Sequence, residues 1–407
     1  MTLTSPRPSV SPAVVAPPPA VLRLAVFALA LGGFGIGTTE FVAMGLLPDI
    51  AAGMNITEPT AGHIISAYAL GVVIGAPVIA SLSGRLSRRV LLVSLMAVFT
   101  LGNLASVVAP TYESLVVARF VAGVPHGAYF GIAALYAARM LGPSHRAKAV
   151  AQVMTGLTLA TVIGVPIASW LGQALGWRSA FALVVLIGVA TLAALWVWLP
   201  EIGTSHTSSP LTELGALKRP QVWLALAIGM VGFGGMFAVY TYIATTMTDV
   251  AGLSRGLVPV ALMVFGAGMV VGNIVGGRMA DKSVIRSLYI TITSLGVMLA
   301  LFVLAAHNPW TALLLLFGIA ASGSAISPAL QTRLMDVAAD AQTLAAALNH
   351  SALNIANAAG AWIGGVVIAA GLGYTAPAAA GALLALCGLV VLTIAVLLQQ
   401  KGKEVQA

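Results

Sequence analysis

The sequence predicts an all-α membrane protein whose twelve transmembrane helices form two pseudo-symmetric six-helix bundles. The first observation is composition: of 407 residues, 59% are hydrophobic and only 7% are charged, whereas soluble domains average about 25% charged residues. The second is that apolar residues gather in twelve runs, each long enough to cross a hydrocarbon core of about 30 Å. The third is a repeat between the two halves of the chain, which predicts the two bundles.

The predicted helices start after a proline-rich segment. Residues 1–20 contain six prolines and no helical period, so we expect a disordered cytoplasmic tail there. The apolar run that follows is too long for the hydrophobic region of a cleaved signal peptide. The predicted helix cores are residues 24–47, 60–82, 90–109, 114–138, 149–171, 179–199, 221–246, 257–280, 288–306, 310–331, 344–370 and 377–399.

A polar stretch divides these helices into two domains. Residues 200–220 are rich in Ser, Thr, Gly and Pro, which predicts a cytoplasmic linker. It separates an N-terminal bundle, residues 21–199, from a C-terminal bundle, residues 221–400, and residues 401–407 form a second cytoplasmic tail. Parallel six-helix repeats are typical of transporters that rock two halves around a central site. A single offset of 197 residues matches Gly71 with Gly268, Gly75 with Gly272, Arg85 with Lys282, Arg89 with Arg286, and Gly176-Trp177 with Gly373-Tyr374.

The basic residues predict the orientation in the membrane. With both termini in the cytoplasm, nearly all Lys and Arg residues fall on the cytoplasmic side, and only Arg178 and Arg255 lie outside. The net charge of +8 therefore indicates orientation in a lipid bilayer and no nucleic-acid partner. The single cysteine, Cys387, excludes an intramolecular disulfide and a cysteine-based metal site.

Glu40 is the acidic residue that the sequence places deepest in hydrocarbon. It lies within the first apolar run beside Thr39, with Gly33 and Gly37 about one and two helical turns before it. A carboxylate at that depth costs several kcal/mol, so it is expected to face a cavity or a partner and marks a functional site. The glycines would let a neighbouring helix or a ligand approach the backbone.

Arg119 lies inside the fourth predicted helix at a depth similar to that of Glu40. Arg119 is about 10 Å from the outer end of its helix and Glu40 about 12 Å from the outer end of the first, at 1.5 Å per residue. Pairing, or a shared wet cavity, would be the less costly arrangement for two opposite charges. The alternative is a purely structural ion pair that locks the two helices together.

Further polar residues in the predicted helices are candidate substrate contacts. His126 shares a helix stripe with Arg119 and Gly123, and it could bind a substrate or a neighbouring hydroxyl such as that of Tyr129. His350, Asn354 and Asn357 form a stripe on the eleventh helix that either packs helices together or lines a central cavity. The candidate contacts are Thr39, Met44, Gly123, His126, Tyr129, Tyr240, His350, Asn354 and Asn357.

Three segments resemble a known family. The twelve-helix plan, the linker and the basic loop after the second helix are similar to the major facilitator superfamily. The segments TTEFVAMGLLPDIA, RFVAGVPHGAYFG and TGLTLATVIGVPIASWLGQALGWRSAF resemble its bacterial drug:proton antiporter branch, which includes arabinose-type sugar exporters and chloramphenicol exporters. The resemblance implies a monomer in the inner membrane of a bacterium, and a proton-coupling role for Arg119 and Gly123.

The resemblance also implies residues that govern conformational change. Ala80 and Gly84 stand in the first basic loop where the family usually has glycine and aspartate, and Val165 separates the usual glycine–proline pair of the fifth helix. The residues that match the family's conformational motifs are Arg85, Arg88 and Arg89 in the first loop, Gly156, Gly164 and Pro166 in the fifth helix, and Gly277 and Asp281 in the second-half loop.

The expected function is proton-driven export by alternating access. Burial disfavours a charged carboxylate and a nearby arginine favours it, so Glu40 would carry the proton and Arg119 would modulate it. The cargo would be neutral or weakly polar, such as a phenicol or a sugar. A proton-coupled importer is the alternative. We find no catalytic, nucleotide-binding or metal-ligand motif, so an enzyme, an ATP-driven pump and a cofactor are not expected.

Overall fold

The computed structural model describes residues 18–82, 87–141, 146–201, 218–338 and 342–404. Within these ranges every regular element is helical, and twelve helical spans are long and apolar enough to cross a membrane. The predicted all-α fold and the predicted number of spans are therefore confirmed. Most of the predicted N-terminal tail and linker, and the end of the C-terminal tail, lie outside the described residues, so these domain boundaries stay predictions.

The N-terminal half contains the first six spans. Its elements are α1 (Pro19–Gly45), α2 (Leu47–Met54), α3 (Glu58–Leu82), α4 (Arg88–Val108), α5 (Tyr112–Gly123), α6 (His126–Leu141), α7 (Arg146–Leu159), the π-helical turn η3 (Ala160–Gly164), α8 (Val165–Leu175) and α9 (Arg178–Trp198).

The C-terminal half contains the other six. Its elements are α11 (Pro220–Gly232), α12 (Gly234–Thr241), α13 (Ile243–Thr245), the π-helical turn η5 (Thr246–Val250), the 3-10 turn η6 (Arg255–Leu257), α14 (Val258–Lys282), α15 (Val284–Ala305), α16 (Pro309–Ser324), α17 (Ile326–Ala338), α18 (Gln342–Ala369) and α19 (Ala376–Glu404).

Five spans that were predicted as single helices are interrupted in the structure. These are the first (α1 and α2, at its outer end), the fourth (α5 and α6), the fifth (α7, η3 and α8), the seventh (α11, α12 and α13) and the tenth (α16 and α17). Proline accounts for three of the breaks, since it lacks an N–H and clashes with the preceding turn. Pro48 follows the first break, Pro125 lies in the second, and Pro328 follows the last. The fourth span also extends beyond its predicted core, from Tyr112 to Leu141.

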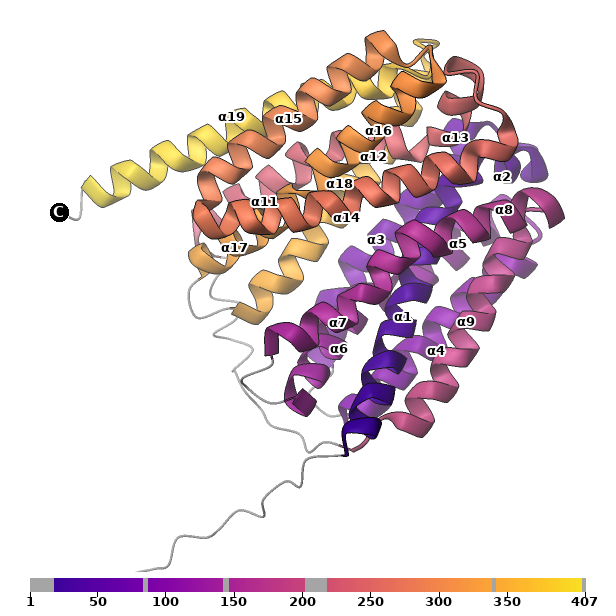
Figure 1. Ribbon diagram of the computed structural model, residues 1–407, viewed down its shortest axis with the longest axis vertical. Helices are drawn as coiled ribbons and strands as arrows, with labels where there is room; N and C mark the ends of the chain where they lie inside the picture. The colour runs from indigo at the N-terminus through magenta and orange to yellow at the C-terminus, as the bar shows by residue number, and fades with distance from the viewer. Residues whose placement is uncertain (1–17, 83–86, 142–145, 202–217, 339–341, 405–407) are drawn as a thin grey trace, which may run out of the picture.

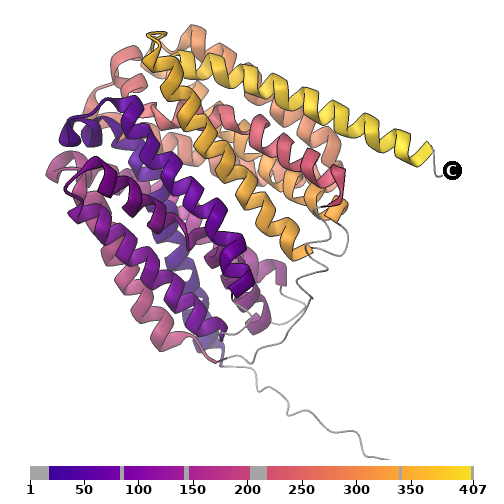
Figure 2. The same ribbon diagram turned by 180° about the vertical axis from the view of Figure 1, so that it is seen from behind.

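The two halves form two bundles that lie side by side (Figure 1). From the opposite side, α18 of the C-terminal bundle runs along α3 of the N-terminal bundle (Figure 2). On the other face, α14 packs against α8 and η3. These two contacts form most of the seam between the bundles, and any group buried there meets residues from both halves.

Polar contacts between the bundles gather at the end of the molecule that carries Asp49, here called the Asp49 end. Arg255 donates a hydrogen bond to Asp49 and forms an ion pair with it. The Thr245 hydroxyl donates to Glu58 Oε2 over 2.6 Å. At the other end, α7 and α17 lie apart (Figure 1). The bundles are therefore held together at the Asp49 end.

Candidate functional site

Glu40 lies near the C-terminal end of α1, buried between the two bundles. Its side chain is only 7% exposed. The carboxyl group interacts electrostatically with Arg119 of α5 and lies next to the amide of Asn357 of α18. The ring of the following residue, Phe41, is 5.7 Å from that of Tyr240 of α12. One acidic group therefore meets side chains from both halves of the protein.

Close packing around α1 comes from small residues, as the sequence predicted. A Cβ atom on Gly37 would lie 2.7 Å from a methyl group of Leu157, and one on Gly156 would lie 1.9 Å from the carbonyl oxygen of Ala30. Only glycine allows α1 and the fifth span to approach this closely. The fifth span thus forms one wall beside Glu40.

Arg119 does not pair directly with Glu40. Its side chain is 0% exposed. Nη1 donates to the Thr39 hydroxyl over 2.8 Å and Nη2 donates to the Thr39 carbonyl over 2.9 Å. Neither residue takes part in an ion pair among the described residues. Of the arrangements that the sequence left open, direct pairing is therefore not the one in this conformation. Arg119 is held by Thr39, the residue before Glu40, while its charge still acts on the carboxyl group.

Thr39 connects Arg119 to a third helix. The Thr39 hydroxyl donates to Asn103 Oδ1 of α4 over 2.5 Å, and Asn103 Nδ2 donates to the Phe99 carbonyl over 2.8 Å. Asn103 is 0% exposed. We did not predict a role for Asn103. The available signal was a lone amide within the apolar run of the third helix.

Aromatic rings enclose the guanidinium group of Arg119. Its Cζ atom is 4.5 Å from the ring centroid of Tyr68 and 5.1 Å from that of Phe181. Such cation–π contacts partly replace the lost hydration of a buried cation. The Tyr68 hydroxyl in turn lies 3.1 Å from His126 Nδ1, within hydrogen-bond distance.

Two of the candidate contacts in the N-terminal bundle are bound to their own half. His126 pairs with Tyr68, and the Tyr129 hydroxyl donates to the Leu29 carbonyl over 3.0 Å. Tyr129 is thus occupied by the backbone of α1. Gly123 allows contact between α5 and α3, because a Cβ atom there would lie 2.1 Å from the Tyr68 carbonyl oxygen.

The polar stripe on α18 is buried in the protein and incompletely satisfied. The amide oxygen and nitrogen of Asn357 have no hydrogen-bond partner of good geometry within the described ranges, and neither does Asn354 Oδ1. The ring of His350 stacks on that of Phe130 from the other bundle, with centroids 6.3 Å apart. An unpaired buried amide costs free energy, so Asn354 and Asn357 are candidate ligand contacts.

Tyr240 offers another unpaired group beside Glu40. Its ring stacks on that of Phe265 at a centroid distance of 4.0 Å, and its buried hydroxyl has no partner among the residues described. Met44 is fully buried one turn beyond Glu40. Tyr240 and Asn357 are the side chains of the C-terminal bundle that lie beside the carboxyl group.

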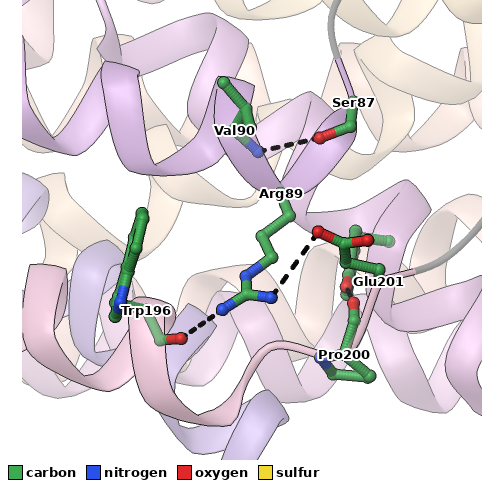
Figure 3. A network of polar contacts seen from close by, with 7 residues as sticks. Ser87, Arg89, Val90, Trp196, Pro200 and Glu201 are labelled. Atoms are coloured by element: carbon green, nitrogen blue, oxygen red, sulfur yellow. Dashed lines mark hydrogen bonds and ion pairs between the residues drawn. The ribbon is translucent and has the colours of Figure 1, made fainter.

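The arginines predicted to govern conformational change lie away from this centre. Arg85 falls outside the described residues. Arg89 donates to the Trp196 carbonyl and lies 3.9 Å from the exposed Glu201, so it ties α4 to the end of α9 (Figure 3). Arg88 is half-buried beside it, and its Nη1 atom has no partner in the described part of the chain.

The second-half loop and the fifth span also depart from regular packing. Asp281 is exposed, and a Cβ atom on Gly277 would meet nothing within 4 Å. In the fifth span, η3 interrupts the α-helix and ends at Gly164, two residues before Pro166. The predicted irregularity is therefore a π-helical turn. α14 packs closely against this turn at Gly266, where an added Cβ atom would lie 2.3 Å from the Thr161 carbonyl oxygen.

A fold of two membrane-embedded six-helix bundles, with polar groups buried at their seam, defines a secondary transporter. Residues 29–340 match the family model of the Major Facilitator Superfamily, and the chain belongs to this family. It is a transporter and not an enzyme.

Individual relatives agree with this assignment. The chain is 41% identical over 360 residues to the inner membrane transport protein YdhP of Escherichia coli K12, covering 88% of this chain and 92% of the relative. It is 33% identical over 377 residues to a chloramphenicol resistance protein of Streptomyces lividans, covering 91% and 95%. The protein is thus a multi-pass inner membrane protein with efflux-type relatives.

A solved structure supports the fold. The D-xylose-proton symporter superposes with a TM-score of 0.70 over 90% of this chain and 97% of its own, at 18% sequence identity. At this identity the likeness establishes the shared fold alone.

Proposed function

We propose that the protein is a proton-coupled antiporter that exports a neutral or weakly polar small molecule by alternating access. The observation that carries the proposal is the position of Glu40 in α1. It is a buried carboxyl group that meets both bundles, yet no ion pair within the described ranges fixes its charge. A group in this position can bind and release a proton as its surroundings change.

The arginine beside Glu40 supplies a way to couple the proton to the transport cycle. Arg119 now bonds to Thr39 and acts on Glu40 from a distance. If the guanidinium group approaches Glu40 in the other conformation, the carboxylate becomes the favoured form and the proton leaves. A ligand drives such a cycle only through different affinities for the two states.

The substrate is proposed to bind between Glu40 and the unpaired groups of the C-terminal bundle. Tyr240 and Asn357 offer a hydroxyl donor, an amide donor and amide oxygen acceptors in buried surroundings. These groups suit a molecule with its own hydroxyl, carbonyl or amide groups. The chloramphenicol resistance relative makes a phenicol the first candidate, and a sugar-like compound is the second.

The proposed orientation places the Arg89 end in the cytoplasm, together with both termini. Arg89, Lys218, Arg278, Lys282 and Arg286 all lie on loops or helix ends of the described chain, and cytoplasmic loops carry an excess of such residues. The Asp49 end then faces outward. On this orientation, the polar contacts between the bundles close the outer side.

The proposal is tested by proton movement in everted membrane vesicles. After a pH gradient is established, phenicols, simple sugars, nucleosides and lipophilic cations are added in turn. We expect one class to dissipate the gradient with the wild type and not with Glu40→Gln. Glu113→Gln is the matched control, because Glu113 is an exposed acid in the first turn of α5.

Two results would contradict the proposal. A Glu40→Gln variant that still dissipates the gradient removes Glu40 from the mechanism. A substrate response that occurs only in right-side-out vesicles indicates symport, which is the import alternative.

A further inference from the structure

Asn103 occupies a position that the proposed mechanism leaves unexplained. It is a fully buried amide in α4, a helix that contributes none of the predicted proton-coupling or substrate-contact residues. Its side chain makes two hydrogen bonds, one within α4 and one to α1. The bond to α1 ends on Thr39, the residue that holds Arg119.

The orientation of the Asn103 amide follows from its partners. Its Nδ2 atom donates to the Phe99 carbonyl, a group that can only accept. The amide oxygen therefore points at Thr39, and the Thr39 hydroxyl must donate its single hydrogen to it. The lone pairs of that hydroxyl are left free, and Arg119 Nη1 donates to one of them.

Thr38 shows what Thr39 would do without Asn103. The Thr38 hydroxyl donates to the Phe34 carbonyl of its own helix over 2.7 Å, the usual arrangement for threonine in a helix interior. Thr39 instead reaches across to α4. Asn103 thus replaces the backbone of α1 as the acceptor for the Thr39 hydroxyl. The hydroxyl oxygen is then oriented to accept a hydrogen bond from Arg119.

We infer that Asn103 is a positioning residue for proton coupling, which holds Thr39 so that Arg119 stays off Glu40 in this conformation. The inference rests on the proposed function. Two features favour a bond that is made in one state and broken in another. Arg119 Nε has no partner within the described residues, and the neighbouring Glu40 makes no ion pair there.

The inference predicts how Glu40 titrates when the contact is lost. The charged or titratable groups that act on Glu40 in the described structure are Arg119 of α5, Tyr68 of α3 and Tyr240 of α12. Of these, only Arg119 is a cation that can move closer to the carboxyl group. When the Thr39 hydroxyl is lost or turned away, Arg119 keeps the bond from Nη2 to the Thr39 carbonyl. A guanidinium group held by that bond alone can approach Glu40 and stabilise the carboxylate, so the proton is released at lower pH.

The experiment is an infrared titration of the full-length protein in liposomes, without substrate. The carbonyl stretch of protonated Glu40 is assigned by its loss in Glu40→Gln. Asn103→Leu and Thr39→Val each remove the contact at nearly constant volume. We expect both to move the midpoint of the Glu40 titration down by about one pH unit or more, since an arginine beside a carboxyl group has an effect of about one to three units.

Matched variants separate positioning from a general disturbance. Thr39→Ser keeps the hydroxyl and is expected to titrate as the wild type does. Thr38→Val removes an equally buried hydroxyl on the same helix and is expected to leave the midpoint in place. Unchanged midpoints in both Asn103→Leu and Thr39→Val, or an equal shift in Thr38→Val, would overturn the inference.

Failure of the inference can be told apart from failure of the proposed function. Suppose that Glu40 titrates and Glu40→Gln abolishes transport, but the midpoint of the Glu40 titration is the same in Asn103→Leu as in the wild type. Only the positioning role of Asn103 is then refuted. If the carboxyl band does not change with pH in the wild type, proton carriage by Glu40 and the role of Asn103 are both refuted.

Discussion

Removing two polar contacts at the Asp49 end should shift the balance between the two conformations of the transporter. The ion pair between Arg255 and Asp49 and the hydrogen bond from Thr245 to Glu58 both cross from one bundle to the other. The double variant Thr245→Val, Arg255→Gln removes both with little change in side-chain volume. The bundles should then separate more readily at this end.

The free energy that the two contacts contribute depends on how exposed their side chains are. The side chains of Arg255 and Asp49 are 65% and 15% exposed, and an ion pair with an exposed partner contributes about 0.2–1 kcal/mol. The bond to the partly buried Glu58 contributes about 1 kcal/mol after allowance for nearby solvent. The sum of about 1–2 kcal/mol corresponds to a change of about 5- to 30-fold in the ratio of open to closed molecules.

Distances between two spin labels measure this ratio. Labels at Ala52 of α2 and Ser254 before η6 are exposed on opposite bundles at the Asp49 end. The background carries Cys387→Ser, since Cys387 is the single cysteine of the chain. We expect the longer-distance population to grow relative to the shorter one by the factor above.

A control pair with the same chemistry makes the result decisive. In Thr248→Val, Arg178→Gln, the lost hydroxyl bonds to Ala244 of the same bundle, and the lost guanidinium bonds to the Ala109 carbonyl of its own bundle. Equal shifts in the two double variants, or none in either, would refute the reasoning.

The packing and the substrate wall give two further predictions. Gly75→Ala should lower the melting temperature, because the new Cβ would lie 2.0 Å from the Val124 carbonyl oxygen, whereas Gly131→Ala meets nothing within 4 Å and should raise helix stability by about 1 kcal/mol. Tyr240→Phe removes an unpaired hydroxyl, so the melting temperature should hold while KM for the transported compound rises about 2- to 13-fold. Tyr242→Phe should instead lower the melting temperature, since its hydroxyl donates to a carbonyl of α18.

The membrane-spanning architecture could be predicted because it depends on properties that a linear sequence records directly. Run length and composition gave the twelve spans, and the 197-residue offset gave the two bundles. Burial of Glu40 and Arg119 followed from depth alone. The breaks near Pro48 and Pro125 could also have been predicted, since proline disfavours a continuous helix.

The contacts of Arg119 could not be predicted in the same way. Counting residues gives depth, but it does not give rotation about the helix axis. Thr39 and Glu40 are adjacent, and successive residues point about 100° apart on a helix, so equal depth allowed either one to receive Arg119. The structure selects Thr39 because Asn103 lies behind it on α4.

Contacts between the bundles could not be predicted from the sequence for a different reason. Asp49 and Arg255 are 206 residues apart, and no local pattern links them. Asn103 is a single amide with no periodic partner. Pairings of this kind depend on how separate helices meet, which only the folded chain determines.

The broken helices have a consequence for the membrane that contains this protein. Besides the fifth span, which contains the π-helical turn η3, the interrupted spans are the first, fourth, seventh and tenth, so each successive group of three helices begins with an interrupted span. If the two ends of the pathway open in turn, as the proposed function requires, such interruptions would let one end of a span move before the other. One end of the pathway would then seal before the other unseals, without a continuous leak that would discharge the ion gradients of the cell.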